Sequence, residues 1–217
     1  MTMRDYRGCV AVAAALVLAG CGGGGESGSA DGKVVALTLK QVRATVPDVE
    51  AMPGWKTILR PVAVEMDDLY RSQACPIKGN AGCENSRFFG SSAFLDRETG
   101  AHVSFQIIAY DSEQAAREGY DVLWDGYYNR RAGAKAKPFE LGPVGDESEA
   151  RIGIAGFKGE AGAVTQTRVG TTVLVTEAAA GEKGGVDEDS ARDLTAVIAE
   201  RARQAQDGDT PSAALDD

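Results

Sequence analysis

The sequence predicts a single α+β domain in which one antiparallel sheet of about five to six strands carries helices packed on one face. Two pairs of strand-like segments, each pair joined by a short glycine-containing turn, indicate β-hairpins and therefore antiparallel pairing. Segments with a 3.6-residue apolar period, each opened by a capping residue, indicate the helices. The length of 217 residues suits one domain with appendages.

The first helix is expected over residues 38–46. Thr38 and Gln41 have the spacing of a capping box, in which each side chain bonds the other residue's backbone N–H, and Pro47 ends the segment. Next in the chain we expect a strand over 56–64, with Pro61 at a sheet edge or bulge, and a short helix or loop over 67–74.

A hairpin is expected over residues 88–95 and 101–110, which flank the turn DRETG. Apolar and polar residues alternate along its second strand, so that strand has one buried and one wetter face. The buried set is Val103, Phe105, Ile107 and Ala109, and the wetter set is His102, Ser104 and Gln106.

The strongest helix signal begins at Asp111, the expected cap, and ends near Arg130 and Arg131. Its apolar stripe comprises Ala116, Tyr120, Leu123, Trp124 and Tyr127. We interpret the aromatic residues Tyr120, Trp124, Tyr127 and Tyr128 as core residues, with the lining of a ligand cavity as the alternative. The later expected elements are a strand over 150–156, a hairpin of 163–169 with 172–177, and a helix capped by Asp187. The globular domain is therefore expected over 34–205, followed by a disordered acidic tail over 206–217.

The N-terminus has the pattern of an export signal. Arg4 and Arg7 precede an apolar stretch of about eleven residues, which is shorter than the roughly twenty needed to span a bilayer. The stretch ends in LAGC at 18–21, which resembles the lipobox of bacterial lipoproteins. That resemblance implies a signal peptide over 1–20, lipidation of Cys21 and cleavage before it.

The residues after Cys21 fit an anchored protein. GGGGESGSADGK completes a flexible tether over 21–33, with a root-mean-square reach of about 20 Å. The alternative is an ordinary secretory signal with a buried Cys21, but a cysteine followed by four glycines has no core in which to be buried. We therefore expect a lipid anchor on Cys21, with palmitate among its acyl chains, that holds the domain on the extracytoplasmic face of the cell membrane.

Two of the four cysteines remain once the signal peptide and Cys21 are set aside. Cys75 and Cys83, in CPIKGNAGC, are expected to form a disulfide because exported proteins occupy an oxidising compartment. The rival interpretations are a zinc site, which needs more Cys or His ligands than this chain supplies, and a redox pair, which favours C-x-x-C spacing.

The net charge of −9 excludes several partners. A nucleic-acid-binding surface requires clustered Lys and Arg, and so does docking of a whole domain on anionic lipid. We therefore expect no nucleic-acid partner, and we expect contact with the membrane through the anchor alone.

Catalytic motifs are weak. The single histidine, His102, lies mid-strand beside Ser104, and the chain has no nucleophile elbow, P-loop or dinucleotide fingerprint. Asp146 and Glu147 form a carboxylate pair that a hydrolase could use, although adjacent carboxylates in a turn more often cap or face water. The acidic run 187–189 suits a helix N-terminus and lacks the frame of a calcium loop. No metal or cofactor is expected.

The remaining candidate site is a groove on the wetter sheet face. Ser104, Gln106, Gln166 and Arg168 are polar residues on expected strands, and together they could line a groove for a polar ligand. The alternative is an ordinary solvated sheet face.

The stretches VSFQIIAYDSEQAA, PVGDES and TRVGTTVLVTE, which follow a cysteine pair, give the chain a layout similar to actinobacterial lipoproteins and to the extracytoplasmic sensor domains of mycobacterial serine/threonine kinases. The resemblance implies a helix-backed antiparallel sheet that senses or binds a small molecule or an envelope protein. The kinase domains have a second disulfide, for which this chain lacks the cysteines. The expected function is non-catalytic binding by a lipoprotein, and the alternative is an extracytoplasmic hydrolase using Asp146 or Glu147.

Overall fold

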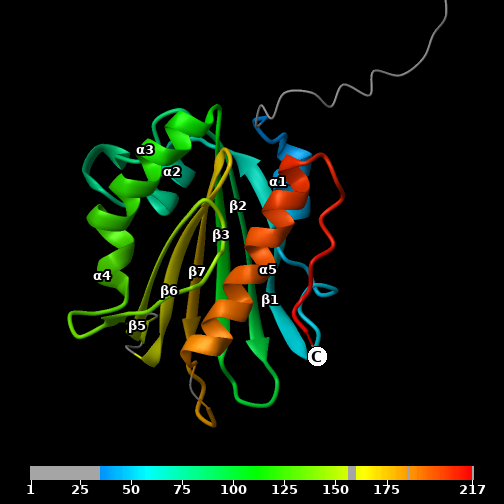
Figure 1. Cartoon of the computed structure of the whole chain (residues 1–217), viewed down its shortest axis with the longest axis vertical. Coiled ribbons are helices and arrows are strands. Elements are labelled where there is room, and N and C mark those ends of the chain that lie inside the picture. Colours follow the sequence, from blue (N-terminus) through cyan, green and yellow to red (C-terminus); the bar gives the residue numbers. More distant parts are fainter. Residues whose placement is uncertain (1–34, 156–159, 185, 217) are drawn as a thin grey trace, which may run out of the picture. The chain divides into compact units, whose positions relative to one another are not determined.

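A computed structural model describes residues 35–155, 160–184 and 186–216, all within one compact unit, Lys33–Asp217. These residues form a seven-stranded antiparallel sheet in the order β1-β2-β3-β7-β6-β5-β4 (Figure 1). The strands are β1 (Trp55–Glu65), β2 (Ser86–Asp96), β3 (His102–Tyr110), β4 (Lys137–Pro138), β5 (Glu147–Ala155), β6 (Glu160–Val169) and β7 (Thr172–Ala179). The expected signal peptide, Cys21 and the whole of the expected tether lie outside the described residues.

The helical segments are α1 (Leu39–Thr45), α2 (Asp68–Ala74), α3 (Glu113–Leu123), α4 (Asn129–Arg131) and α5 (Glu188–Gln206), with a 3-10 turn η1 (Lys78–Asn80) and a π-helical turn η2 (Trp124–Tyr128). Over the ranges that the structure describes, none of these helices has both the length and the apolar character needed to cross a bilayer.

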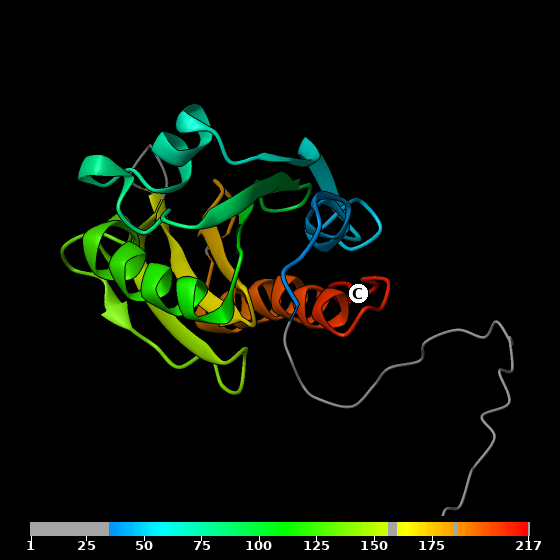
Figure 2. The ribbon, with the colours of Figure 1, turned by 90° about the horizontal axis from the view of Figure 1, so that it is seen from above.

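The predicted α+β class with a single antiparallel sheet is confirmed, and two details differ. The sheet has seven strands, of which the two-residue β4 gave no sequence signal. Helices also cover both faces, so the expectation of helices on one face is wrong. Figure 2 shows α3 and α5 on opposite sides of strands β6 and β7. Strand β3 shows why the second face is also covered. Its end carries Ile108 and Tyr110, which lie on the same face as the polar residues His102, Ser104 and Gln106 but are buried.

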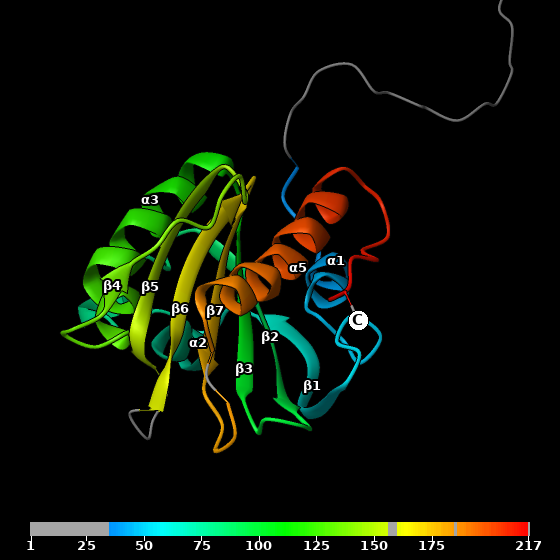
Figure 3. The same cartoon turned by 60° about the horizontal axis from the view of Figure 1, so that its bottom comes forward.

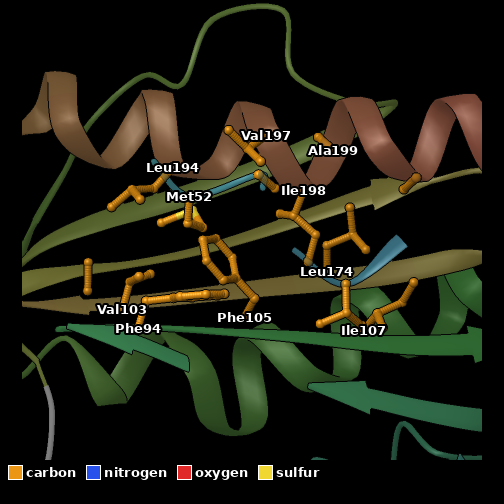
Figure 4. Close-up of a cluster of buried hydrophobic side chains, with 14 of the residues drawn as sticks. Met52, Phe94, Val103, Phe105, Ile107, Leu174, Leu194, Val197, Ile198 and Ala199 are labelled. Carbon is orange, nitrogen blue, oxygen red and sulfur yellow. The ribbon is translucent and has the colours of Figure 1, made fainter. Parts of the chain in front are cut away.

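The first face of the sheet packs against α1 and α5. Figure 4 shows Phe94, Phe105 and Ile107 of the sheet directed toward Leu194 and Ile198 of α5. Burying side chains of this size stabilises the fold by about 1.5–3 kcal/mol each, so this layer supplies much of the hydrophobic stabilisation. The expected caps hold both helices: Thr38 and Gln41 form the capping box of α1, and Asp187 caps α5.

The second face packs against α3 and η2. Tyr120, Leu123 and Trp124 lie in one buried cluster with Val164 and Val173 of the sheet, as the apolar stripe predicted. The cap of α3 is one residue later than expected. The Ser112 side chain, and not that of Asp111, accepts a hydrogen bond from the backbone of Ala115.

The predicted disulfide between Cys75 and Cys83 is present. Two buried tyrosines fix the disulfide loop to the domain. The Tyr110 hydroxyl donates to the carbonyl of Gly82 over 2.6 Å, and the Tyr128 hydroxyl donates to the carbonyl of Ala74 over 2.9 Å. Burial raises the pKa of both phenols far above the usual value, so both remain hydrogen-bond donors.

The C-terminal segment is not a disordered tail, contrary to expectation. Helix α5 continues to Gln206, after which the chain folds back along it (Figure 3). Leu215 packs against the hydrophobic cluster on the first face of the sheet, and its backbone N–H donates to the carbonyl of Ala51 over 2.9 Å. The buried guanidinium of Arg201 donates to the carbonyl of Ala213 over 3.0 Å. Specific contacts of this kind order a polar segment whose composition alone predicts disorder.

Candidate functional site

The second sheet face is covered over only part of its extent. Ile108 is buried near one end of β3, whereas Ser104 is half-buried and His102 is exposed toward the other end. A cavity of about 660 Å³ lies over this open part. The side chains of its wall come from the end of β2, the β2–β3 turn, β3, α4, β7 and the loop after β7. They include Leu95, Arg97, Glu98, Thr99, His102, Ser104, Arg131, Glu177, Ala179, Glu182 and Lys183.

Strand register brings the polar residues of the cavity floor together. Ser104 of β3 lies directly opposite Glu177 of β7, and His102 lies opposite Ala179. Opposed residues of an antiparallel pair have Cβ atoms about 4.5–5.5 Å apart, and residues two apart on a strand share a face. His102, Ser104 and Glu177 therefore project from one small area of the sheet.

An ion pair between Arg131 and Glu177 forms the part of the cavity wall next to these residues. The Nε and Nη2 atoms of Arg131 donate to Oε2 of Glu177 over 3.2 and 2.6 Å, and both side chains are mostly buried. The Arg131 guanidinium also lies 5.8 Å from the centre of the Tyr127 ring. Burial acts to lower the pKa of Arg131, but the hydrogen bond and charge of Glu177 outweigh it and raise the pKa. Arg131 is therefore a fixed cation at the cavity wall.

Backbone contacts hold the rim of the cavity in place. The N–H of Lys183 donates to the carbonyl of Thr99 over 3.2 Å, and the N–H of Gly181 donates to Gly184 over 3.0 Å. A Cβ atom on Gly181 would lie 2.2 Å from the carbonyl oxygen of Thr99. Only glycine permits so close an approach of the two turns.

The chemistry of the cavity is mixed. Leu95, Ala179 and Ala180 provide apolar surface, while the rim carries cations from Arg97 and Lys183. The rim also carries the carboxylates of two further residues, Glu98 and Glu182. Apolar surface combined with a few charged groups of both signs is typical of a site for a small organic ligand.

Only part of the groove predicted from sequence lines this cavity. Ser104 does, whereas the Gln106 side chain lies deeper and accepts a hydrogen bond from Tyr128 over 3.3 Å. Gln166 and Arg168 share the same sheet face but are buried beneath α3, where Gln166 donates to the carbonyl of Tyr120 over 2.7 Å. The prediction that all four residues line one open groove is therefore wrong, because the sequence did not show that α3 covers β6.

The carboxylate pair of the hydrolase alternative has a structural partner. Nε of Arg168 lies 2.6 Å from Glu147, and Nη1 lies 3.0 Å from Asp146, while the Arg168 side chain is only 3% exposed. A buried guanidinium requires such partners, because an unpaired charge in the interior is costly. Asp146 and Glu147 thus neutralise a buried arginine.

His102 lies far from this carboxylate pair. Glu147 pairs with Arg168, Arg168 with Val173, and Val173 with Ile108, which is six residues along β3 from His102. Six residues of strand span about 20 Å. The convergence of His102 with Glu147 that a shared catalytic pocket would require is therefore absent from the structure.

Sequence reasoning missed Arg131 and Glu177 as site residues. Arg131 was expected to serve only as a cation at a helix end, and Glu177 gave no signal beyond its place at the end of a strand. They are 46 residues apart in the chain, and only the packing of α4 over β7 joins them. Within the described ranges, His, Cys, Asp and Glu side chains form no group of three or more that could hold a metal ion.

Comparisons with known proteins bear on the fold. No protein-family model matches the chain, and the search of curated proteins found no match. Among solved structures, the chain is similar to the extracellular domain of PknH from Mycobacterium tuberculosis, with a TM-score of 0.51 and 12% sequence identity. The match covers 81% of this chain and 100% of that domain. The two proteins share a fold, in agreement with the resemblance to kinase sensor domains noted in the sequence.

Proposed function

We propose that this protein is a non-catalytic, sensor-like binding domain that recognises a small ligand in the cavity over the open part of its sheet. The observation that carries the proposal is the cavity of about 660 Å³, whose wall contains the fixed Arg131–Glu177 pair. Volumes of about 300–1,000 Å³ are typical of small-molecule sites. The shared fold with an extracellular domain of a kinase supports a sensing role.

The wall favours a ligand with an apolar body and charged ends. Leu95 and the alanines after β7 suit the body, and the rim cations Arg97 and Lys183 suit a carboxylate or phosphate group. The rim carboxylates suit an amine. A peptide fragment or a modified amino acid has this combination of groups.

We also propose that the domain is held on the outer face of the cell membrane by lipid on Cys21. The basis is the LAGC sequence at 18–21 behind a basic and apolar leader. Replacing Cys21 with alanine should release the protein into the medium or leave it unprocessed. A wild-type N-terminus that carries no acyl mass on Cys21 in mass spectrometry would overturn the anchor and leave the binding proposal intact.

Native mass spectrometry of the protein purified gently from its own host tests the binding proposal. The wild-type chain should carry an additional mass, and S104F should lose it, because a phenyl ring at Ser104 fills the cavity floor. The matched control is S91F. Ser91 is also half-buried and lies on the neighbouring strand of the same face, outside the cavity wall. Equal retention of the additional mass by all three proteins would place the ligand elsewhere, and its absence from the wild type would overturn the proposal.

A further inference from the structure

A second surface, formed by α1 and the edge strand β1, differs in character from the rest of this acidic protein. Lys40 and Arg43 of α1 face Arg60 of β1 across a groove of about 800 Å³, which is also lined by Val49 and Ile58. We call these five residues the basic groove.

The basic groove has an excess of positive charge. Its three cations have no ion-pair partner among the residues that the structure describes. The only carboxylate in its lining, Asp48, accepts a hydrogen bond from Ala51 over 3.0 Å and lies 3.8 Å from Arg201. On a chain with a net charge of −9, three clustered cations without counter-charges create a local positive field.

The basic groove also exposes apolar side chains. Val49 is 59% exposed and Ile58 is 56% exposed. Ile58 projects outward because the register between β1 and β2 shifts between Thr57 and Leu59. A bulge of this kind re-aims a side chain away from the sheet. Cations around exposed aliphatic groups are typical of surfaces that lie at a membrane interface.

The edge of β1 is poorly suited to binding an extended peptide as an added strand. A second register shift separates Leu59 from Val62, and Pro61 between them has no N–H to donate. Bulges, proline and basic side chains are the features that protect edge strands from pairing. These features favour a partner that contacts side chains over one that bonds the backbone.

We propose that the basic groove docks on anionic phospholipid, with Lys40, Arg43 and Arg60 at the headgroups and Val49 and Ile58 at the interface. The biological setting rests on the proposed anchor, because helix α1 begins only 18 residues after Cys21 in the sequence. A short tether raises the effective concentration of a second contact to the millimolar range, so weak docking suffices. Acidic residues farther than about 8–10 Å from the surface are screened at physiological salt.

Vesicle binding by the unacylated chain tests the groove separately from the anchor. The chain from residue 21 onward carrying C21A, which lacks the basic and apolar leader that would itself bind lipid, should sediment with vesicles of phosphatidylglycerol and should not sediment with vesicles of phosphatidylcholine alone. Each cation at an anionic surface contributes about a fivefold gain in affinity. Neutralising all three with K40Q, R43Q and R60Q should therefore weaken binding to the anionic vesicles about a hundredfold.

The matched control changes the net charge by the same amount elsewhere. Arg130, Lys135 and Lys137 are exposed cations near α4 and β4, and their replacement with glutamine should leave vesicle binding within twofold of the C21A protein. Equal loss in both triple variants would show that net charge alone matters, and absence of binding to anionic vesicles would also overturn the proposal. Binding to soluble polyglutamate without binding to vesicles would overturn it in favour of an acidic protein partner.

Discussion

Replacing Arg201 with methionine should destabilise the domain by about 3 kcal/mol. The Arg201 guanidinium is buried and donates to the carbonyls of Thr45 over 3.1 Å, Ala44 over 2.8 Å and Ala213 over 3.0 Å. These bonds join α1, α5 and the C-terminal segment. Methionine keeps the apolar stem but leaves the carbonyls without a donor.

The magnitude follows from the two carbonyls at the end of α1. A buried acceptor left without a partner costs about 1–3 kcal/mol, so Ala44 and Thr45 together cost about 2–6 kcal/mol. The substitution also removes the free-energy cost of burying the Arg201 charge, and this gain offsets part of the loss. Burial lowers the pKa of Arg201, and the nearest carboxylate, on Asp48, is 3.8 Å away. The carbonyl of Ala213 lies in the C-terminal segment, where it can bond water once Arg201 is gone, so its loss adds little to the change in stability.

Urea denaturation followed by circular dichroism measures the change. With an m-value of about 2 kcal/mol per M, the midpoint should fall by about 1.5 M. The control is R203M on the same helix, where the exposed Arg203 side chain pairs with Glu200 and its loss should cost less than about 0.5 kcal/mol. If R201M and R203M have midpoints within experimental error of each other, the guanidinium does not hold α1 and the C-terminal segment together.

Three further predictions concern the loops and the last helix. Replacing Cys75 and Cys83 with serine should lower the free energy of unfolding by about 2.5 kcal/mol, since the disulfide closes a short loop; a wild-type midpoint that dithiothreitol leaves unchanged would contradict this. D187A should cost about 1 kcal/mol at pH 7 in urea denaturation by loss of the α5 cap. Hydrogen bonds from Ser190 lower the pKa of Asp187 in the folded state, so this cost should shrink as the pH falls below about 4; a cost that stays constant down to pH 2.5 would rule out a contribution of the charge. G181A should lower the thermal midpoint and reduce ligand retention together, and retention at the wild-type level would show that the rim does not shape the cavity.

The hairpins and helices could be predicted because their signals are local. Period-two alternation placed β2 and β3, and the turn at Gly170 placed β6 beside β7, as the register confirms. The capping residues Thr38 and Asp187 likewise marked the starts of α1 and α5 within a residue. In each case the information lies within about ten neighbouring residues.

The two-sided covering of the sheet could not be predicted, because it depends on contacts between distant segments. The polarity of Gln166 and Arg168 indicated a solvated face, but both residues are buried with partners. Gln166 donates a hydrogen bond to the carbonyl of Tyr120 in α3. Arg168 forms ion pairs with Asp146 and Glu147. A buried polar residue with partners looks the same in the sequence as an exposed one.

The candidate site was predicted in part. His102 and Ser104 were placed correctly on one face of β3, since alternation determines the face. The other half of the site needs the pairing of β3 with β7, which are separated by a long crossover that no local pattern specifies. The basic groove was missed for a similar reason, because a net charge of −9 conceals a cluster of three cations that only α1 and β1 together create.

Hydrogen–deuterium exchange in the presence of an extract of the host envelope shows directly whether the cavity is the ligand site. If the ligand occupies the cavity, exchange should be slower in the β2–β3 turn over 97–102 and in the segment 177–183, with no change over 146–149. Slower exchange over 146–149 without protection of the cavity rim would contradict this assignment, because the ligand would then bind at the Asp146 and Glu147 end of the sheet.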